Sequence, residues 1–145
     1  MNFEKYAAHG NAFVNEVANA LELGSDKDRA GRIVRSVLHA LRARLTVAES
    51  FHLLAQLPMA LKAVYVDGWV PSPQPDKHIK TSDDLVEQVL ILDGATAVRD
   101  LPTLSFGRRA VDAVFHVLKR HISAGEVQGV SRGLPRALQQ MWDAA

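Results

Sequence analysis

The side chains most able to do chemistry lie along one predicted helix in the first half of the chain. Three arginines and a histidine recur there at steps of three and four residues, at Arg32, Arg35, His39 and Arg42. On a helix of 3.6 residues per turn these four side chains share one side, turned away from the apolar stripe. Arginine binds phosphate and carboxylate groups through paired hydrogen bonds. The spacing therefore predicts a basic helix face that could hold an anion or nucleic acid.

The second half of the chain repeats part of this pattern with Arg109, His116 and Lys119, whereas Asp112 stands where the first half has Arg35. We call the following seven residues the basic ridge: Arg32, Arg35, His39, Arg42, Arg109, His116 and Lys119. Because the net charge is only +1, we favour an ordinary solvated helix face that is paired with acidic neighbours. Anion or nucleic-acid binding is the alternative, and nucleic acid is the less favoured partner without being excluded.

The two histidines of the ridge occupy equivalent positions in the two halves. In a two-fold arrangement His39 and His116 would face each other as a metal pair or as an acid/base couple. Two ligands are too few for a metal site, so we predict neither a metal site nor a cofactor. Glu49 and Glu126 also match across the halves, but their positions at helix starts already explain them.

No motif in the sequence identifies a reaction. The chain contains no cysteine, which excludes disulfides, thiolate metal sites and a cysteine nucleophile. It also lacks a Gly-rich phosphate loop, a Ser-centred elbow and a His-Glu-x-x-His helix. We therefore predict no catalytic residue, and an enzyme or a metal site between the halves is only a third alternative.

Apolar residues at helical spacing define the elements that must position these groups. In the first half they predict helices over residues 3–22 and 25–45, followed by two short helices that Pro58 divides. In the second half they predict the same order, with Pro135 between the last two helices. Residues 95–105 show no clear period, and we leave their structure open.

Polar residues just before these apolar series predict the helix N-caps. We expect caps at Ser25, Thr46, Ser82, Ser105 and Ser123. A glutamate follows Thr46 and Ser123 after three residues, which predicts two capping boxes.

The two halves align without a gap when residues 31–65 are laid on residues 108–142. Ten of the 35 aligned positions are identical, against about two or three expected by chance. The opening helices align at a shift of 72, so the second half has gained five residues after its first helix. We predict an all-α fold, a pseudo-symmetric bundle of about eight helices from a tandem duplication.

Each half is too short to bury its apolar stripes alone, so we expect both halves to share one compact domain. The first helical repeat is predicted over residues 1–67 and the second over 83–145. Residues 68–82 hold three of the six prolines and form the connector between them. Trp69 lies at the start of this connector. We favour its folding back onto the bundle, and the alternative is an exposed anchor for a partner.

The run from Ala30 to Thr46, followed by Glu49 and by Ala55-Gln56-Leu57-Pro58, resembles a bacterial family known as domain of unknown function 2267. The resemblance covers both halves, and its most specific piece is the Gln-Leu-Pro step, which the second half replaces by Gly133-Leu134-Pro135. It implies a helical fold and a bacterial, cytoplasmic setting. It carries over no catalytic or ligand-binding residue.

The sequence shows neither a signal-peptide pattern nor a membrane-spanning run. The N-terminus shows no basic segment followed by an apolar run, and no apolar run approaches the roughly 20 residues that span a bilayer. We therefore expect a cytoplasmic protein without membrane contact. The leading hypothesis is a non-enzymatic module that binds a protein partner or a second copy of itself.

Overall fold

The computed structural model describes residues 1–145 and confirms the all-α prediction. Eight helices have eight residues or more, and α6 adds a single turn. The α-helices are α1 (Glu4–Ala20), α2 (Lys27–Arg44), α3 (Val47–Gln56), α4 (Met59–Val66), α5 (Ser82–Asp93), α6 (Ala97–Asp100), α7 (Leu104–His121), α8 (Ala124–Gly133) and α9 (Arg136–Ala144). A 3-10 turn, η1 (Gly94–Thr96), joins α5 to α6. No helix combines the length and apolar character that crossing a membrane requires.

Corresponding helices of the two halves have matching lengths. Helices α2 and α7 both contain 18 residues, and α3 and α8 both contain 10. The bounds of α7 and α8 lie 77 residues after those of α2 and α3, which is the offset of the sequence alignment. The origin of this likeness in a duplication stays a prediction.

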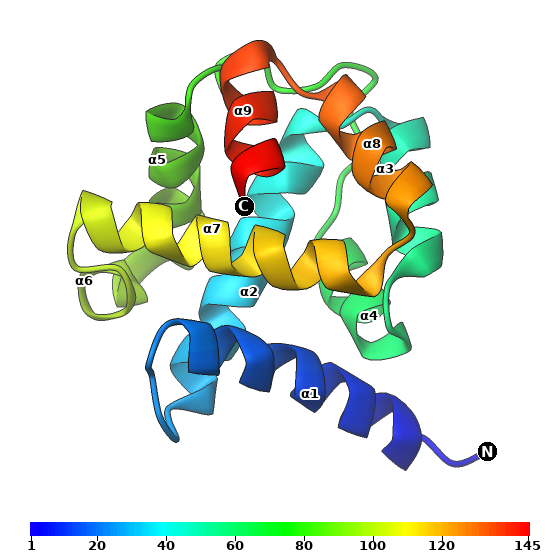
Figure 1. Ribbon diagram of the computed structural model, residues 1–145, viewed down its shortest axis with the longest axis vertical. Helices are drawn as coiled ribbons and strands as arrows, with labels where there is room; N and C mark the ends of the chain where they lie inside the picture. The colour runs from blue at the N-terminus through cyan, green and yellow to red at the C-terminus, as the bar shows by residue number, and fades with distance from the viewer.

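The long helices α2 and α7 cross at the centre of the molecule (Figure 1). Helices α5 and α6 lie on one side of this crossing, and α3 and α8 lie together on the other. The first helix of each half packs on the long helices of both halves, because α1 contacts α2 and α7 while α5 contacts α2 and α7. The halves are thus interlocked.

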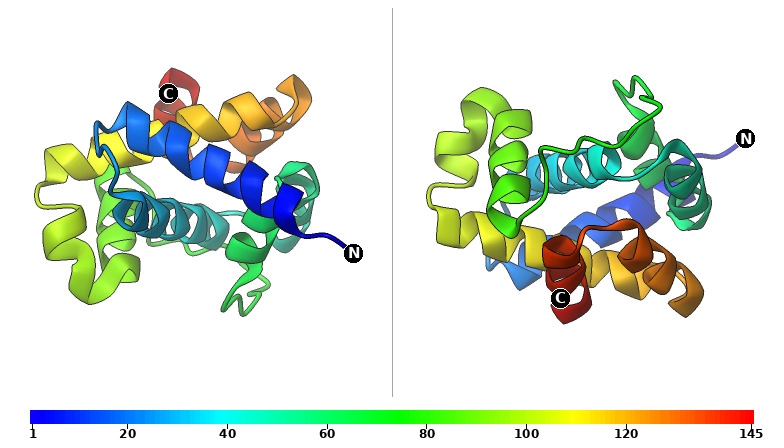
Figure 2. Two further views of the ribbon diagram at one scale, coloured as in Figure 1. Left: turned by 90° about the horizontal axis from the view of Figure 1, so that it is seen from below. Right: turned by 90° about the horizontal axis from the view of Figure 1, so that it is seen from above.

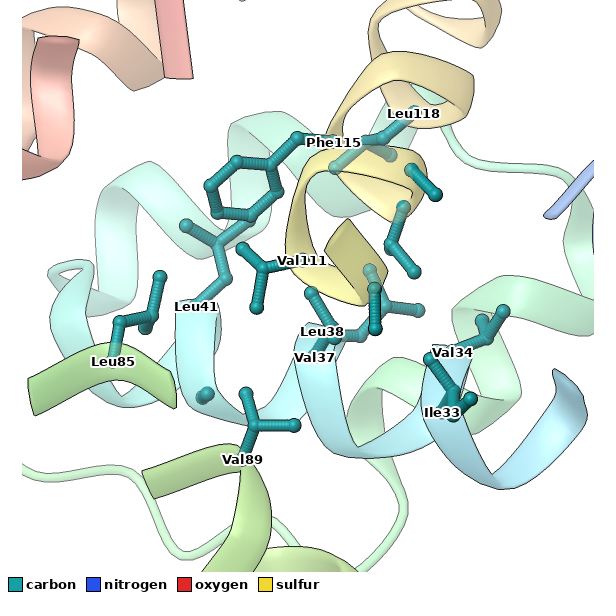
Figure 3. Close-up of a cluster of buried hydrophobic side chains, with 14 of the residues drawn as sticks. Ile33, Val34, Val37, Leu38, Leu41, Leu85, Val89, Val111, Phe115 and Leu118 are labelled. Carbon is teal, nitrogen blue, oxygen red and sulfur yellow. The ribbon is translucent and has the colours of Figure 1, made fainter. Parts of the chain in front are cut away.

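The core lies at this crossing, where apolar side chains of both halves meet (Figure 3). Val37, Leu38 and Leu41 of α2 face Val111 and Phe115 of α7, and all five are at most 1% exposed. Each fully buried side chain of this size contributes about 1.5–3 kcal/mol to folding. The buried apolar residues of the two halves form a single cluster.

Three of the predicted N-caps, at Ser25, Ser82 and Ser105, are wrong. The side chains that accept the N–H bonds belong to Asp26, Thr81 and Thr103. A cap must leave helical geometry itself while its oxygen reaches the N–H three residues on, and in each case a residue one or two positions away meets this condition. The predicted box at Thr46 is complete, with Thr46 Oγ1 accepting from Glu49 N and Glu49 Oε2 accepting from Thr46 N.

The segment between α5 and α7 contains η1 and α6, which have no counterpart between α1 and α2. This segment lies after α5 and packs against α2 of the first half. Gly94, in the left-handed region at φ 67°, turns the chain at the end of α5. This segment therefore brings Asp100 to Arg32 of the basic ridge.

Candidate binding site beneath the connector

Arg32 of the basic ridge is bound to a buried carboxylate from α6. Its Nε and Nη2 donate to Asp100 Oδ2 and Oδ1 at 2.8 and 2.9 Å, and Asp100 is 1% exposed. The hydrogen bond from Arg32 holds the pKa of Asp100 below its usual value, and the bond to Asp100 raises the pKa of Arg32. Arg29 adds two bonds to the backbone oxygen of Asp100. Arg32 therefore anchors α6 to α2.

A second carboxyl group lies next to this pair. Burial raises the pKa of Asp93, and the neighbouring Asp100 carboxylate adds to this shift, so that the pKa reaches about 6. Asp93 Oδ2 is buried and has no hydrogen-bond partner. The two carboxyl groups and Arg32 form a coupled cluster at the end of α5.

The next ridge residue, Arg35, makes an ion pair at the surface. Its Nη2 lies 2.9 Å from Asp67 Oδ2, and the two side chains are 47% and 64% exposed. Such a pair contributes at most about 1 kcal/mol because water screens both charges. Arg35 thus belongs to a solvated helix face, as we favoured for the ridge.

His39 is buried beneath the end of α4. Its Nε2 lies 2.7 Å from the backbone oxygen of Val64. Burial lowers the pKa of His39, and the charge of Arg42 lowers it further, whereas the Val64 bond opposes the shift. The ring is therefore neutral near pH 7, with Nε2 donating to Val64.

Arg42 closes the C-terminal end of α4. Its Nη1 donates to the backbone oxygens of Tyr65 and Asp67 at 2.7 and 2.9 Å. These carbonyl groups lie at the C-terminal end of α4, where carbonyl groups have no N–H partner within the helix. Burial lowers the pKa of Arg42. Its Nε and Nη2 make no hydrogen bond within the protein.

The second half uses its ridge residues differently. Lys119 Nζ donates to the backbone oxygens of Trp142 and Ala145 at 2.8 Å each, so it closes α9 as Arg42 closes α4. The Arg109 guanidinium lies 5.6 Å from the centre of the Phe106 ring. His116 is exposed beside the C-terminal end of α9.

The structure does not bring His39 and His116 into one site. His39 lines a cavity beneath the connector, whereas His116 lines a separate surface hollow with Asp112. No group of three or more histidine and carboxylate side chains is placed to hold a metal ion.

The largest hollow of the molecule, of about 640 Å³, lies between the connector, α2 and α5. The connector runs alongside α2 from α4 to α5 (Figure 2, right). It is held by a 2.8 Å bond from Asp76 N to the oxygen of Ala43 and by the buried side chain of Ile79. The polar lining includes His39, Arg42, Lys77 and Gln88.

Trp69 folds back onto the bundle at the rim of this cavity, which is the outcome we favoured. Its ring lies 6.0 Å from the ring of Tyr65, edge to face, and 5.9 Å from that of Phe51. The indole remains half-buried, and its neighbours Phe51 and Val70 are 58% and 87% exposed. The rim is therefore an exposed apolar surface next to a polar cavity.

Several residues that build this region have no recognisable signal in the sequence. Phe51 lies within a capped helix, while Lys77 and Gln88 occupy different segments, so no spacing joins them. Asp100 lies within residues 95–105, which show no clear period. Only the path of the connector and the docking of α6 place these residues beside the ridge.

A smaller cavity of about 160 Å³ lies between α3 and α8. The capping box predicted at Ser123 is wrong: Glu126 N donates to Ser123 Oγ, but Gln56 Oε1 accepts from Ser123 N at 2.6 Å. Glu126 instead lines the cavity together with His52. Burial raises the pKa of Glu126, and the neighbouring His52 opposes this shift.

Comparison with known proteins places the chain in a family. The model of the family described as uncharacterized conserved protein (DUF2267) matches residues 10–141. No curated protein matches the chain. Because the match spans most of both halves, the chain belongs to the DUF2267 family.

Proposed function

We propose that this member of the DUF2267 family is a non-enzymatic binding module that takes a protein partner on its connector face. The connector face consists of Phe51, Trp69 and Val70 together with the cavity beneath residues 68–77. One observation carries the proposal: aromatic and aliphatic side chains stay exposed on the rim of the largest hollow of the molecule.

The make-up of this face fits what protein partners use. Partner-binding surfaces concentrate aromatic anchors next to a pocket, surrounded by groups that can form hydrogen bonds. Trp69 is held by Tyr65 and Phe51, so little conformational entropy would be lost when a partner covers it. The connector contributes prolines on its exposed side, which further limit its motion.

The experiment compares two double variants that each replace two exposed apolar side chains. Phe51→Ser with Val70→Ser alters the connector face, and Ile91→Ser with Val98→Ser is the control, because those side chains are 71% and 81% exposed elsewhere. Circular dichroism checks that both variants keep the helical fold. Partners captured from a lysate of the source cells are then compared by quantitative mass spectrometry.

We expect a partner that the native protein and the control retain and that the connector-face variant loses by about tenfold or more. A set of partners that both variants retain equally would overturn the proposal. Light scattering covers self-association: a mass above 15.9 kDa that returns to the monomer only in the connector-face variant would identify a second copy as the partner.

Anion or nucleic-acid binding through the basic ridge is our second candidate. One observation favours it, namely the two nitrogens of Arg42 that lack acceptors. Against it, Arg32, Arg35 and Lys119 are engaged within the protein. Phosphate contacts release counterions, so binding to a nucleic-acid duplex must weaken steeply with salt if this candidate is right.

We also propose that the protein arose by tandem duplication and works in a bacterial cytoplasm. The offset of 77 between equal helices and the ten identities support the duplication. The absence of cysteine agrees with a reducing compartment. Cell fractionation with an antibody against the protein tests the location, and recovery of the protein outside the cytoplasmic fraction would contradict it.

A further inference from the structure

Arg42 differs from Arg32 and Arg35, the two other arginines of the basic ridge in the first half. Arg32 is bound to the carboxylate of Asp100, and Arg35 is bound to that of Asp67. Arg42 contacts only backbone carbonyls, and these engage Nη1 alone. It is thus a partly buried cation whose remaining donors face no acceptor of the protein.

The equivalent residue in the second half, Lys119, shows that a cation can close a helix end without leaving nitrogens that lack an acceptor. Lys119 Nζ lies within 3.4 Å of three backbone oxygens, so a single nitrogen directs its donors at the end of α9. A lysine would thus be enough to cap α4. The guanidinium at position 42 leaves two further nitrogens beside the cavity.

The charge of the cavity favours an anion. Arg42 and Lys77 are its cationic groups, and Asp76 is the single acidic residue of the lining. Asp76 Oδ1 already accepts from the backbone N–H of His78. Burial lowers the pKa of Arg42, which indicates a guanidinium that has lost part of its water. An incoming carboxylate can accept hydrogen bonds from the two nitrogens that bind no carbonyl, and it would balance this charge.

The cavity also has an apolar wall beside Arg42. Trp69, Val70 and Leu92 belong to its lining, and Trp69 is fixed against the aromatic rings of the rim. A ligand of matching chemistry therefore carries an apolar or aromatic group next to its carboxylate.

We propose that the cavity beneath the connector binds a carboxylate of a protein partner, with Arg42 holding the carboxylate and Trp69 packing against the adjacent apolar side chain. This inference rests on the proposed function and names the chemistry of its partner. A nucleic acid fits less well, because it needs a row of free cations, and Arg32 and Arg35 of the same helix are already paired.

The test uses a probe pair that differs only in charge, 2-naphthoate and its neutral counterpart 2-naphthamide. Each is titrated into the ¹⁵N-labelled protein, which contains two tryptophans. The indole N–H of Trp69 reports on the cavity, and that of Trp142, which is buried and bonded to the oxygen of Val127, is the internal reference. We expect naphthoate to shift the Trp69 signal saturably, with an affinity at least about tenfold above that of the amide.

Two variants that each remove one helix-end cation complete the test. Arg42→Gln should abolish the preference for naphthoate, while Lys119→Gln, which removes the equivalent bonds from α9, should leave it unchanged. Arg42→Lys should retain part of the preference. Equal binding of acid and amide, no binding of either, or equal loss in both glutamine variants would overturn the inference.

Short apolar peptides then distinguish the two sources of the carboxylate. One peptide has a free C-terminus and no acidic side chain, and the other has a glutamate and an amidated C-terminus; the tighter binder identifies the source, and failure of both would contradict a protein partner. The experiments can refute the proposed function and the carboxylate site independently of each other. A partner lost on changing Phe51 and Val70, without any preference for naphthoate, would retain the proposed function and reject the carboxylate.

Discussion

The C-terminal helices of the two halves, α4 and α9, end in the same way but in different surroundings. Arg42 and Lys119 donate to the last carbonyls of these helices, 77 residues apart. Tyr65 and Trp142, also 77 residues apart, are both completely buried, and each bonds to residue 50 or its equivalent 127. In the first half the connector passes over the long helix α2, and the largest cavity lies between them. The same closure of a helix end thus has different surroundings in the two halves.

The same comparison explains the basic ridge. Asp100, at the end of α6, reaches back to Arg32 of the first half. The equivalent Arg109 meets only an aromatic ring. Two arginines at equivalent positions in the sequence therefore differ in role: Arg32 is an anchor, whereas Arg109 lies on the surface.

The largest expected difference between the halves concerns these two arginines. Arg32→Gln leaves the buried carboxylate of Asp100 without its ion pair, so we expect the free energy of unfolding to fall by about 2 kcal/mol, less than for a fully buried pair because Arg32 is 38% exposed. Arg109→Gln should change it by less than about 0.5 kcal/mol. Urea unfolding measures both values. Equal losses of unfolding free energy in the two variants would show that the ion pair between Arg32 and Asp100 does not stabilise the fold.

A smaller loss of stability is expected at Tyr65, which bonds to the side chain of Ser50, whereas the equivalent Trp142 bonds to the backbone oxygen of Val127. Tyr65→Phe removes the 2.6 Å bond to Ser50 Oγ and leaves a completely buried hydroxyl unpaired. The free energy of unfolding should fall by about 1 kcal/mol. Thermal denaturation checks this, with the additional change Ser50→Ala as control. The double variant should recover part of the loss, and further destabilisation would contradict the account.

Asp93 should make the stability of the α5–α6 end depend on pH. Its pKa is about 6 in the folded protein, above the reference value of 3.8, so the folded state retains a proton that the unfolded chain loses. This contribution to stability is complete below about pH 4 and is lost as the pH rises towards 6. The buried His39 acts in the opposite direction, because its lowered pKa removes stability as the pH falls below 6.5.

The difference between the native protein and Asp93→Asn isolates this dependence, since His39 is common to both. Between pH 4 and 7 the variant should gain stability relative to the native protein, by about 1 kcal/mol at most after allowance for partial exposure. Urea unfolding across this range provides the measurement. A difference that does not change with pH would refute the raised pKa.

The smallest predicted effect concerns the caps of α3 and α8. The side chain of Gln56 accepts a hydrogen bond from the N–H of Ser123. Gly133, at the equivalent position, has no side chain, so the N–H of Thr46 donates to Glu49 instead. In Gln56→Ala we expect Glu126 to turn back and complete the second capping box, with a net loss of only a few tenths of a kcal/mol. The chemical shift of the Ser123 amide and the pKa of Glu126, which should fall, are measurable by NMR. An unchanged Glu126 pKa would count against this exchange.

Much of the fold could be predicted from the sequence because its signals are local. Helix bounds follow from apolar spacing, and the box at Thr46 and Glu49 follows from three neighbouring residues. Caps were misplaced by a residue or two where Ser, Thr and Asp adjoin, since several side chains there could accept the same N–H.

The candidate site could be predicted only in part. Arg42 and Trp69 attract attention in the sequence, but their partners Tyr65, Phe51 and Lys77 share no spacing with them. Long-range contacts depend on crossing angles and on the path of the connector, which periodicity does not encode.

The sequence by itself determined the helices, most of their ends and the correspondence of the two halves, because hydrogen bonds within a helix and the apolar stripe depend on residues within a few positions. Only the tertiary structure decided that Asp100 reaches Arg32, that Gln56 displaces Glu126 and that the connector covers Arg42. These contacts join segments 20 to 70 residues apart, and their formation depends on how the helices pack.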